Sequence, residues 1–268
     1  MEAEVHNHIK LFTVFIVLLI AFFPYKLNAD VKYFGRSYSS YTLPANALEI
    51  EFWQTGRIGK GIGSYFRWQP RIEIEYGLTD RLTTSFYFNF NEVRSYDNQI
   101  QSKPLSLYTS SIELRYRLSN PNEYFVDPAL YFEFSYGGDK IEYEPKILIS
   151  KRFDNFVSVL NINSEFERNI AKNENESSFE LTMGIAYEVT KNISLGLEFR
   201  NHRNYLDTFK KEENQASFIG PTFSFHSDRF YFVINLLTQL GGSPSTKDNF
   251  EFSSHEKYEL RTILGVEL

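Results

Sequence analysis

Acidic side chains spaced two residues apart are the most prominent chemical feature of this 268-residue sequence. Glu73 and Glu75 form one pair, and Glu165 and Glu167 form another. Two carboxylates can supply the acid and the base of a glycosidase. The same i,i+2 spacing recurs in several other segments, however, which favours a structural role for these pairs.

Histidines offer a second chemistry. His202 and His226 are predicted to share one polar face at opposite ends of their strands, so they cannot hold one metal. His255 opens the last predicted strand, two strands away from the neighbour of His202, and a metal site needs three or more ligands. The GxSxG, P-loop and HExxH motifs are all missing. We therefore expect no catalytic residue, no metal and no cofactor, with a Ser/His hydrolase as a remote alternative.

Composition excludes several classes of protein. The 26 Phe and 18 Tyr are too many for a disordered chain. The lack of cysteine excludes a disulfide framework, a thiolate metal site and a lipoprotein anchor. The net charge of −6 without a basic block argues against a nucleic-acid partner.

The N-terminus carries a predicted secretion signal. Residues 11–23 are thirteen residues with one polar member, which is shorter than the roughly 20 that span a bilayer. Such a core followed by Leu27-Asn28-Ala29 is typical of a cleaved signal peptide. We expect a signal peptide at residues 1–29 and one domain at residues 30–268, with an uncleaved anchor as the alternative.

The rest of the chain alternates with a period of two. In residues 65–76, Phe66, Ile72 and Ile74 alternate with Arg67, Arg71 and Glu73. A strand turns successive side chains to opposite faces, so one face is apolar and the other charged. The pattern predicts twelve strands, at residues 48–55, 65–76, 82–90, 112–118, 128–136, 141–151, 156–167, 179–189, 193–200, 219–226, 230–239 and 258–268.

Short turns and longer polar loops alternate between these strands. Together with the even strand number, this layout is typical of a transmembrane antiparallel up-and-down β-barrel with both termini on the periplasmic side. Many strands approach the roughly 9–11 residues that cross a bilayer. Aromatic residues also lie at both ends of the apolar face, as at two membrane interfaces. The alternative is a soluble β-sandwich, in which the apolar faces are buried.

In a barrel the charged face lines the lumen, where acids outnumber bases. A filled lumen with paired charges and a narrow water-filled passage that favours cations are both compatible with this pattern. No loop is long enough to form a folded plug, so we expect side chains to form any constriction. The predicted lumen-lining residues are Glu49, Glu51, Arg67, Arg71, Glu73, Glu75, Glu113, Arg115, Arg117, Glu133, Glu142, Glu144, Lys146, Glu165, Glu167, Glu198, Arg200, Glu259 and Arg261.

Two stretches resemble a known group of proteins. They are LEIEFWQTGRIGKGIGSYFRWQPRIEIEYGLTDRLTTSFYFNF (residues 48–90) and YELRTILGVEL (residues 258–268). They are similar to uncharacterised bacterial outer-membrane barrels grouped with transporters of the phenol-degradation-pathway type. The resemblance implies an outer-membrane location, lipid contact and insertion by the barrel-assembly machinery. Such barrels usually end in an aromatic residue that the assembly machinery reads, whereas this chain ends in Leu268, a departure that bears on the efficiency of assembly more than on the fold.

The sequence therefore predicts a narrow outer-membrane channel for passive passage of a small polar or cationic solute. One alternative is a closed barrel with a structural or surface-binding role, and a barrel-embedded hydrolase is a weaker one.

Overall fold

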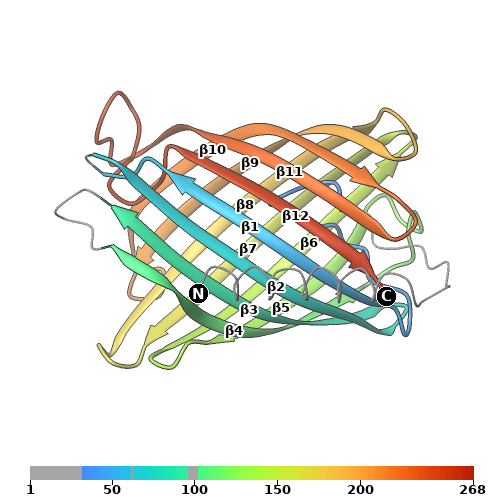
Figure 1. Ribbon diagram of the computed structural model, residues 1–268, viewed down its shortest axis with the longest axis horizontal. Helices are drawn as coiled ribbons and strands as arrows, with labels where there is room; N and C mark the ends of the chain where they lie inside the picture. The colour runs from blue at the N-terminus through green and yellow to red at the C-terminus, as the bar shows by residue number, and fades with distance from the viewer. Residues whose placement is uncertain (1–31, 62, 96–101) are drawn as a thin grey trace, which may run out of the picture.

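The computed structural model describes residues 32–61, 63–95 and 102–268. In these residues twelve antiparallel strands close into one barrel (Figure 1), which confirms the predicted fold class and strand number. No helix in this part of the chain is long and apolar enough to cross a bilayer. The predicted signal peptide, residues 1–29, lies outside the described residues.

Each strand pairs with its neighbours in the sequence, and β1 pairs with β12 to close the barrel. At this seam the backbone N–H of Leu268 donates to the carbonyl oxygen of Leu48 at 2.9 Å. The strands are β1 (Leu48–Ile58), β2 (Tyr65–Thr79), β3 (Leu82–Ser95), β4 (Lys103–Arg117), β5 (Asp127–Tyr136), β6 (Lys140–Phe153), β7 (Phe156–Asn169), β8 (Glu174–Glu188), β9 (Ile193–Leu206), β10 (Lys211–His226), β11 (Phe230–Ser243) and β12 (Tyr258–Glu267).

Several strands run further toward the long loops than predicted. β10 begins at Lys211 and β4 at Lys103, both within segments that the sequence assigned wholly or partly to loops. The first residues of β10 are polar on both faces because they extend beyond the apolar belt, whereas the start of β4 exposes Leu105 and Leu107. The backbone ladder continues there without the alternation that marks a half-buried strand.

The outer face of the barrel is apolar and its inner face is charged, which is the reverse of the arrangement in a soluble protein. On β2, Ile74 is 37% exposed, whereas Glu73 and Glu75 on either side are 0% and 2% exposed. Apolar side chains are exposed in the same way on the other strands, with Tyr116, Tyr187 and Phe230 near the short turns. A closed barrel with an outer apolar belt and aromatic ends is the bacterial outer-membrane type, so this barrel spans that membrane. The sandwich alternative is wrong.

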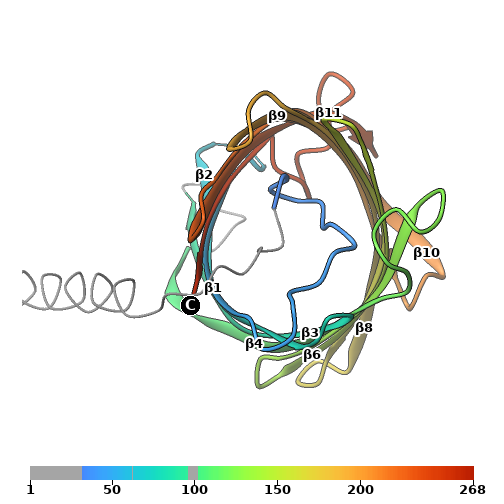
Figure 2. The same cartoon turned by 90° about the vertical axis from the view of Figure 1, so that its right-hand side faces the viewer.

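Residues 32–47, which we call the lumen segment, lie inside the barrel (Figure 2). The segment starts at the short-turn end, where the Lys32 carbonyl oxygen accepts a hydrogen bond from His226 Nε2 at 2.9 Å. It returns to that end, where Leu43 N donates to Thr83 Oγ1 and Ala45 N to Asp80 Oδ1. The prediction that only side chains constrict the lumen is therefore wrong, because the backbone of this segment crosses its periplasmic half.

Candidate functional site

The lumen segment turns around a single buried carboxylate. Glu198 of β9 accepts hydrogen bonds from the backbone N–H groups of Gly35, Arg36 and Ser37 at 2.8–2.9 Å. Asn235 of β11 donates to the same carboxylate at 2.6 Å. Charge-assisted hydrogen bonds of this kind are about twice as strong as neutral ones, so they hold the turning point of the segment in place.

Contacts with the wall continue on both sides of this turn. Tyr38 exchanges hydrogen bonds with the Asn161 side chain, from Tyr38 N to Oδ1 at 2.7 Å and from Nδ2 to the Tyr38 carbonyl at 2.9 Å. The Phe34 ring packs over Gly184 of β8, where an added Cβ would lie 2.6 Å from the ring. Hydrogen bonds and packing contacts therefore hold the segment against several strands around the barrel, so the segment is an ordered part of the fold.

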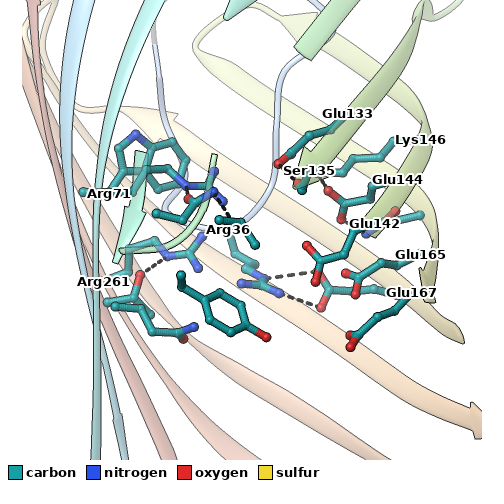
Figure 3. Close-up of a pocket in the computed structure, with 18 of the residues that line it drawn as sticks. Arg36, Arg71, Glu133, Ser135, Glu142, Glu144, Lys146, Glu165, Glu167 and Arg261 are labelled. Atoms are coloured by element: carbon teal, nitrogen blue, oxygen red, sulfur yellow. Dashed lines mark hydrogen bonds and ion pairs between the residues drawn. The ribbon is translucent and has the colours of Figure 1, made fainter. Parts of the chain in front are cut away.

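A polar cavity of about 500 Å³ lies on the long-loop side of the segment. Arg71 and Arg261 line one wall, and Arg36 reaches from the segment between that wall and the other (Figure 3). Glutamates of β5, β6 and β7 face them from the opposite side, with Lys146 among them. The cavity therefore has one basic wall and one wall in which acidic side chains predominate.

Acidic and basic side chains are equal in number around this cavity. The acid excess predicted for the lumen lies instead beneath the lumen segment, in Glu49, Glu51, Glu73, Glu75 and Glu113. The cavity is lined by Glu133, Glu142, Glu144, Glu165, Glu167, Glu176 and Glu180 and by Arg36, Arg57, Arg67, Arg71, Lys140, Lys146 and Arg261.

Some of the charged side chains that line the cavity form ion pairs with one another. Arg36 pairs with Glu180 at 2.8 Å, and Lys146 pairs with Glu144 at 3.1 Å. Arg67 and Arg71 instead donate to Asn91 and Asn89, both at 2.6 Å. In the described part of the chain these two arginines have no carboxylate within ion-pair distance, so both can take an anionic group.

Every side chain predicted to line the lumen is at least half-buried, although its part in solute passage stays a prediction. Some lie under the lumen segment and others around the cavity. The buried ones are Glu49, Glu51, Glu73, Glu75, Glu113, Arg115, Glu133, Glu198, Arg200, Glu259 and Arg261; the half-buried ones are Arg67, Arg71, Arg117, Glu142, Glu144, Lys146, Glu165 and Glu167.

The family model for a family of unknown function, DUF6662, matches residues 26–268. The chain belongs to this family. No curated protein sequence matches it. The phenol-degradation-pathway type in particular stays a prediction, since the matching model is that of DUF6662.

Solved structures share the fold of this DUF6662 protein at low sequence identity. The COG4313 outer membrane channel from Pseudomonas putida F1 has a TM-score of 0.63 and 14% identity, covering 85% of this chain and 98% of the channel. The NanC porin has a TM-score of 0.56 and 8% identity, covering 82% and 100%. The KdgM porin in complex with disordered oligogalacturonate has a TM-score of 0.52 and 11% identity, covering 82% and 99%.

The structure places two histidines closer than the sequence predicted. The rings of His202 and His255 lie 5.4 Å apart, because the chain between β11 and β12 folds back into the barrel mouth. Burial, with Arg200 and Arg57 nearby, lowers the pKa of His255 to about 3, so its ring is neutral at physiological pH. His226 lies at the other end of the barrel, as predicted. Among the described residues no histidine is hydrogen-bonded to a serine, so no hydrolase dyad is assembled there.

The functional residues that the sequence missed lie outside the predicted strands. Arg36 and Tyr38 belong to the lumen segment, and Arg57 and Lys140 lie at strand ends. No periodic pattern marks Arg36 and Tyr38, whereas Arg57 and Lys140 continue the lumen-facing alternation just beyond the predicted strands. The one available signal for the lumen segment was the run of polar and aromatic residues between the predicted signal peptide and the first strand.

Proposed function

We propose that this DUF6662 protein is an outer-membrane channel for passive passage of a small polar solute, narrowed on its periplasmic side by the lumen segment. The observation that carries the proposal is the polar cavity of about 500 Å³ above that segment. Ligand pockets for small molecules have volumes of roughly 300–1,000 Å³. The fold shared with the COG4313 channel and the NanC porin supports a channel.

The charges of the cavity argue for a solute with groups of both signs. Arg67 and Arg71 can each offer a guanidinium group to an anionic group of the solute. Glu165, which has no ion-pair partner in the described residues, lies on the opposite wall (Figure 3). A purely cationic solute, which the acid excess of the sequence favoured, would meet repulsion from the arginine wall. A small zwitterion or a neutral polar molecule fits both walls.

Planar-bilayer recording tests the proposal. The mature chain should give small conductance steps, and a variant without residues 32–45 should give larger ones, because the backbone that crosses the periplasmic half is removed. Asn46 stays in this variant because its N–H donates to the Gly77 carbonyl at the barrel rim, at 2.8 Å. Absence of steps from both proteins, each shown to be folded by heat-modifiable migration, would contradict a channel.

A closed barrel with a structural role is the second candidate. It is favoured by the hydrogen bonds of the lumen segment and by fully buried ion pairs such as Arg200–Glu180 at 2.6 Å. It predicts no conductance from the mature chain and steps only after deletion of the segment. Recording therefore separates the two candidates.

A further inference from the structure

Four buried glutamates face one another on β1 and β2. Glu49 lies directly opposite Glu75, and Glu51 directly opposite Glu73. All four are at most 2% exposed and lie beneath the lumen segment. Like charges directly opposite on neighbouring strands are destabilising, and buried charges need compensation.

The nearby cations compensate only part of this charge. Lys32 Nζ lies 2.5 Å from Glu51, and Arg115 lies 3.6 Å from Glu75 and 2.8 Å from Glu113. Arg71, the next guanidinium, bonds to Asn89 and lies over the Tyr87 ring. Even with Arg71 counted, three cations meet five buried carboxylates.

Hydrogen bonds also leave oxygens unused. The Tyr231 hydroxyl donates to Glu49 at 2.5 Å and to Glu51, and Trp53 Nε1 donates to Glu51 at 2.5 Å. Both carboxylate oxygens of Glu73, together with Glu49 Oε2 and Glu75 Oε1, are buried without a hydrogen-bond partner. Buried polar atoms are nearly always partnered in native proteins. Three of these oxygens have no partner of any kind, and Glu75 Oε1 has only its ion pair with Arg115 at 3.6 Å, so the cluster indicates a missing partner.

The spacing of the carboxylates fits a metal ion. One oxygen from each of Glu49, Glu51 and Glu75 lies within 4.8 Å of the others. Oxygens that bind Ca²⁺ at about 2.3–2.6 Å are at most roughly 5 Å apart across the ion. The all-oxygen donor set suits a hard divalent cation.

We propose that Glu49, Glu51 and Glu75 bind a divalent cation, with Ca²⁺ as the best fit, and that the negative charge of Glu73, directly opposite Glu51, adds to the attraction for the ion. The ion neutralises the two carboxylates that the nearby cations leave uncompensated. It also ties β1 and β2 to the start of the lumen segment, since Lys32 shares Glu51 with it. This site is independent of solute passage.

A second acidic cluster has a similar spacing of carboxylates but lacks the buried, unpartnered oxygens of the first. Glu142, Glu165 and Glu167 have a similar spacing at the cavity. They are half-buried, and Lys140 pairs with both Glu142 and Glu167. No oxygen of these three is buried without a partner. Lys140 and the partial exposure of the three side chains therefore leave that cluster without the unpartnered buried oxygens that mark the first.

Terbium luminescence tests the proposal on the full mature chain in detergent. Tb³⁺ replaces Ca²⁺ at oxygen sites, and Trp53 is the neighbouring sensitiser because its Nε1 bonds to Glu51. Emission should saturate at one site per chain and be displaced by added Ca²⁺. Glu73→Gln and Glu49→Gln should each weaken Tb³⁺ binding at least about tenfold, because each removes a charge next to the ion. Glu188→Gln is the control, since Glu188 also touches the lumen segment but is paired with Arg152.

A substitution that is expected to tighten Tb³⁺ binding, rather than weaken it, makes the test more specific. Lys32→Gln removes the cation that competes for Glu51 and should tighten Tb³⁺ binding about tenfold or more. A merely structural cluster whose carboxyl groups share protons would bind no Tb³⁺ in any variant. No saturable emission from the folded wild type, or equal affinity in wild type and Glu49→Gln, would overturn the proposal.

Discussion

The backbone N–H of Arg36 donates a hydrogen bond to the Glu198 carboxylate at 2.9 Å, in the interior of the barrel. This contact joins the turning point of the lumen segment to β9, far from it in the sequence. Because Gly35 and Ser37 donate to the same carboxylate, the position of the segment depends strongly on one side chain.

Replacing that side chain should loosen the segment. Glu198→Gln removes the negative charge and turns an amide toward the backbone donors, which should cost about 2 kcal/mol or more. Hydrogen exchange should then be faster at residues 35–38 than in the wild type. Glu92→Gln is a suitable control because Glu92 pairs with Arg94 on its own strand. Unchanged exchange at residues 35–38 would contradict the role of Glu198.

The contact between Phe34 and Gly184 predicts a pair of coupled substitutions. Gly184→Ala places a methyl group 2.6 Å from the Phe34 ring and should displace the segment. Phe34→Ala should restore space for that methyl group, so the double variant should lose less stability than the two single losses added together. Urea unfolding in detergent measures all three variants. Strict additivity would show that the ring and the glycine are not in contact.

The two walls of the cavity predict opposite shifts in ion selectivity. Arg71→Gln removes a positive charge from the basic wall and should move the reversal potential in a salt gradient toward cation preference. Glu165→Gln should move it toward anion preference. Glu165→Gln keeps the side-chain size, so its conductance should change less than its selectivity, whereas Arg71→Gln also shortens the side chain and should raise conductance slightly. Shifts of the same sign in both variants would contradict the arrangement in Figure 3.

The apolar belt predicts a cost for charge on the outer face. Ile147 lies midway along β6 and is 46% exposed. Ile147→Arg should destabilise the barrel by about 2–4 kcal/mol, the range for arginine near the bilayer midplane. Glu213→Arg, at an exposed position near the loop end of β10, should be nearly neutral. Chemical unfolding in lipid vesicles compares the two, and equal stability would mean that Ile147 does not face lipid.

The sequence predicted the barrel wherever lipid and lumen impose opposite demands on alternating residues. Residues 65–76 show this, because every second side chain faces acyl chains. It could not predict the strand that begins at Lys211, because both faces of that strand are exposed to water there and its residues do not alternate in polarity. It also missed the lumen segment, since Gly35 and Tyr38 are held by side chains more than a hundred residues away and leave no periodic signal.

Narrowing of the passage by the lumen segment, held in its position inside the barrel, is the central claim, and one recording tests it most directly. The chain has no cysteine, and Ser40 N donates to Ser150 Oγ at 2.8 Å, so Ser40→Cys with Ser150→Cys can tether the segment to β6. Single-channel conductance of the oxidised variant should match the small steps of the wild type, whereas the variant without residues 32–45 should give larger steps. Steps of the oxidised variant as large as those of the deletion variant, with the disulfide shown to form, would contradict a segment that narrows the passage from this position.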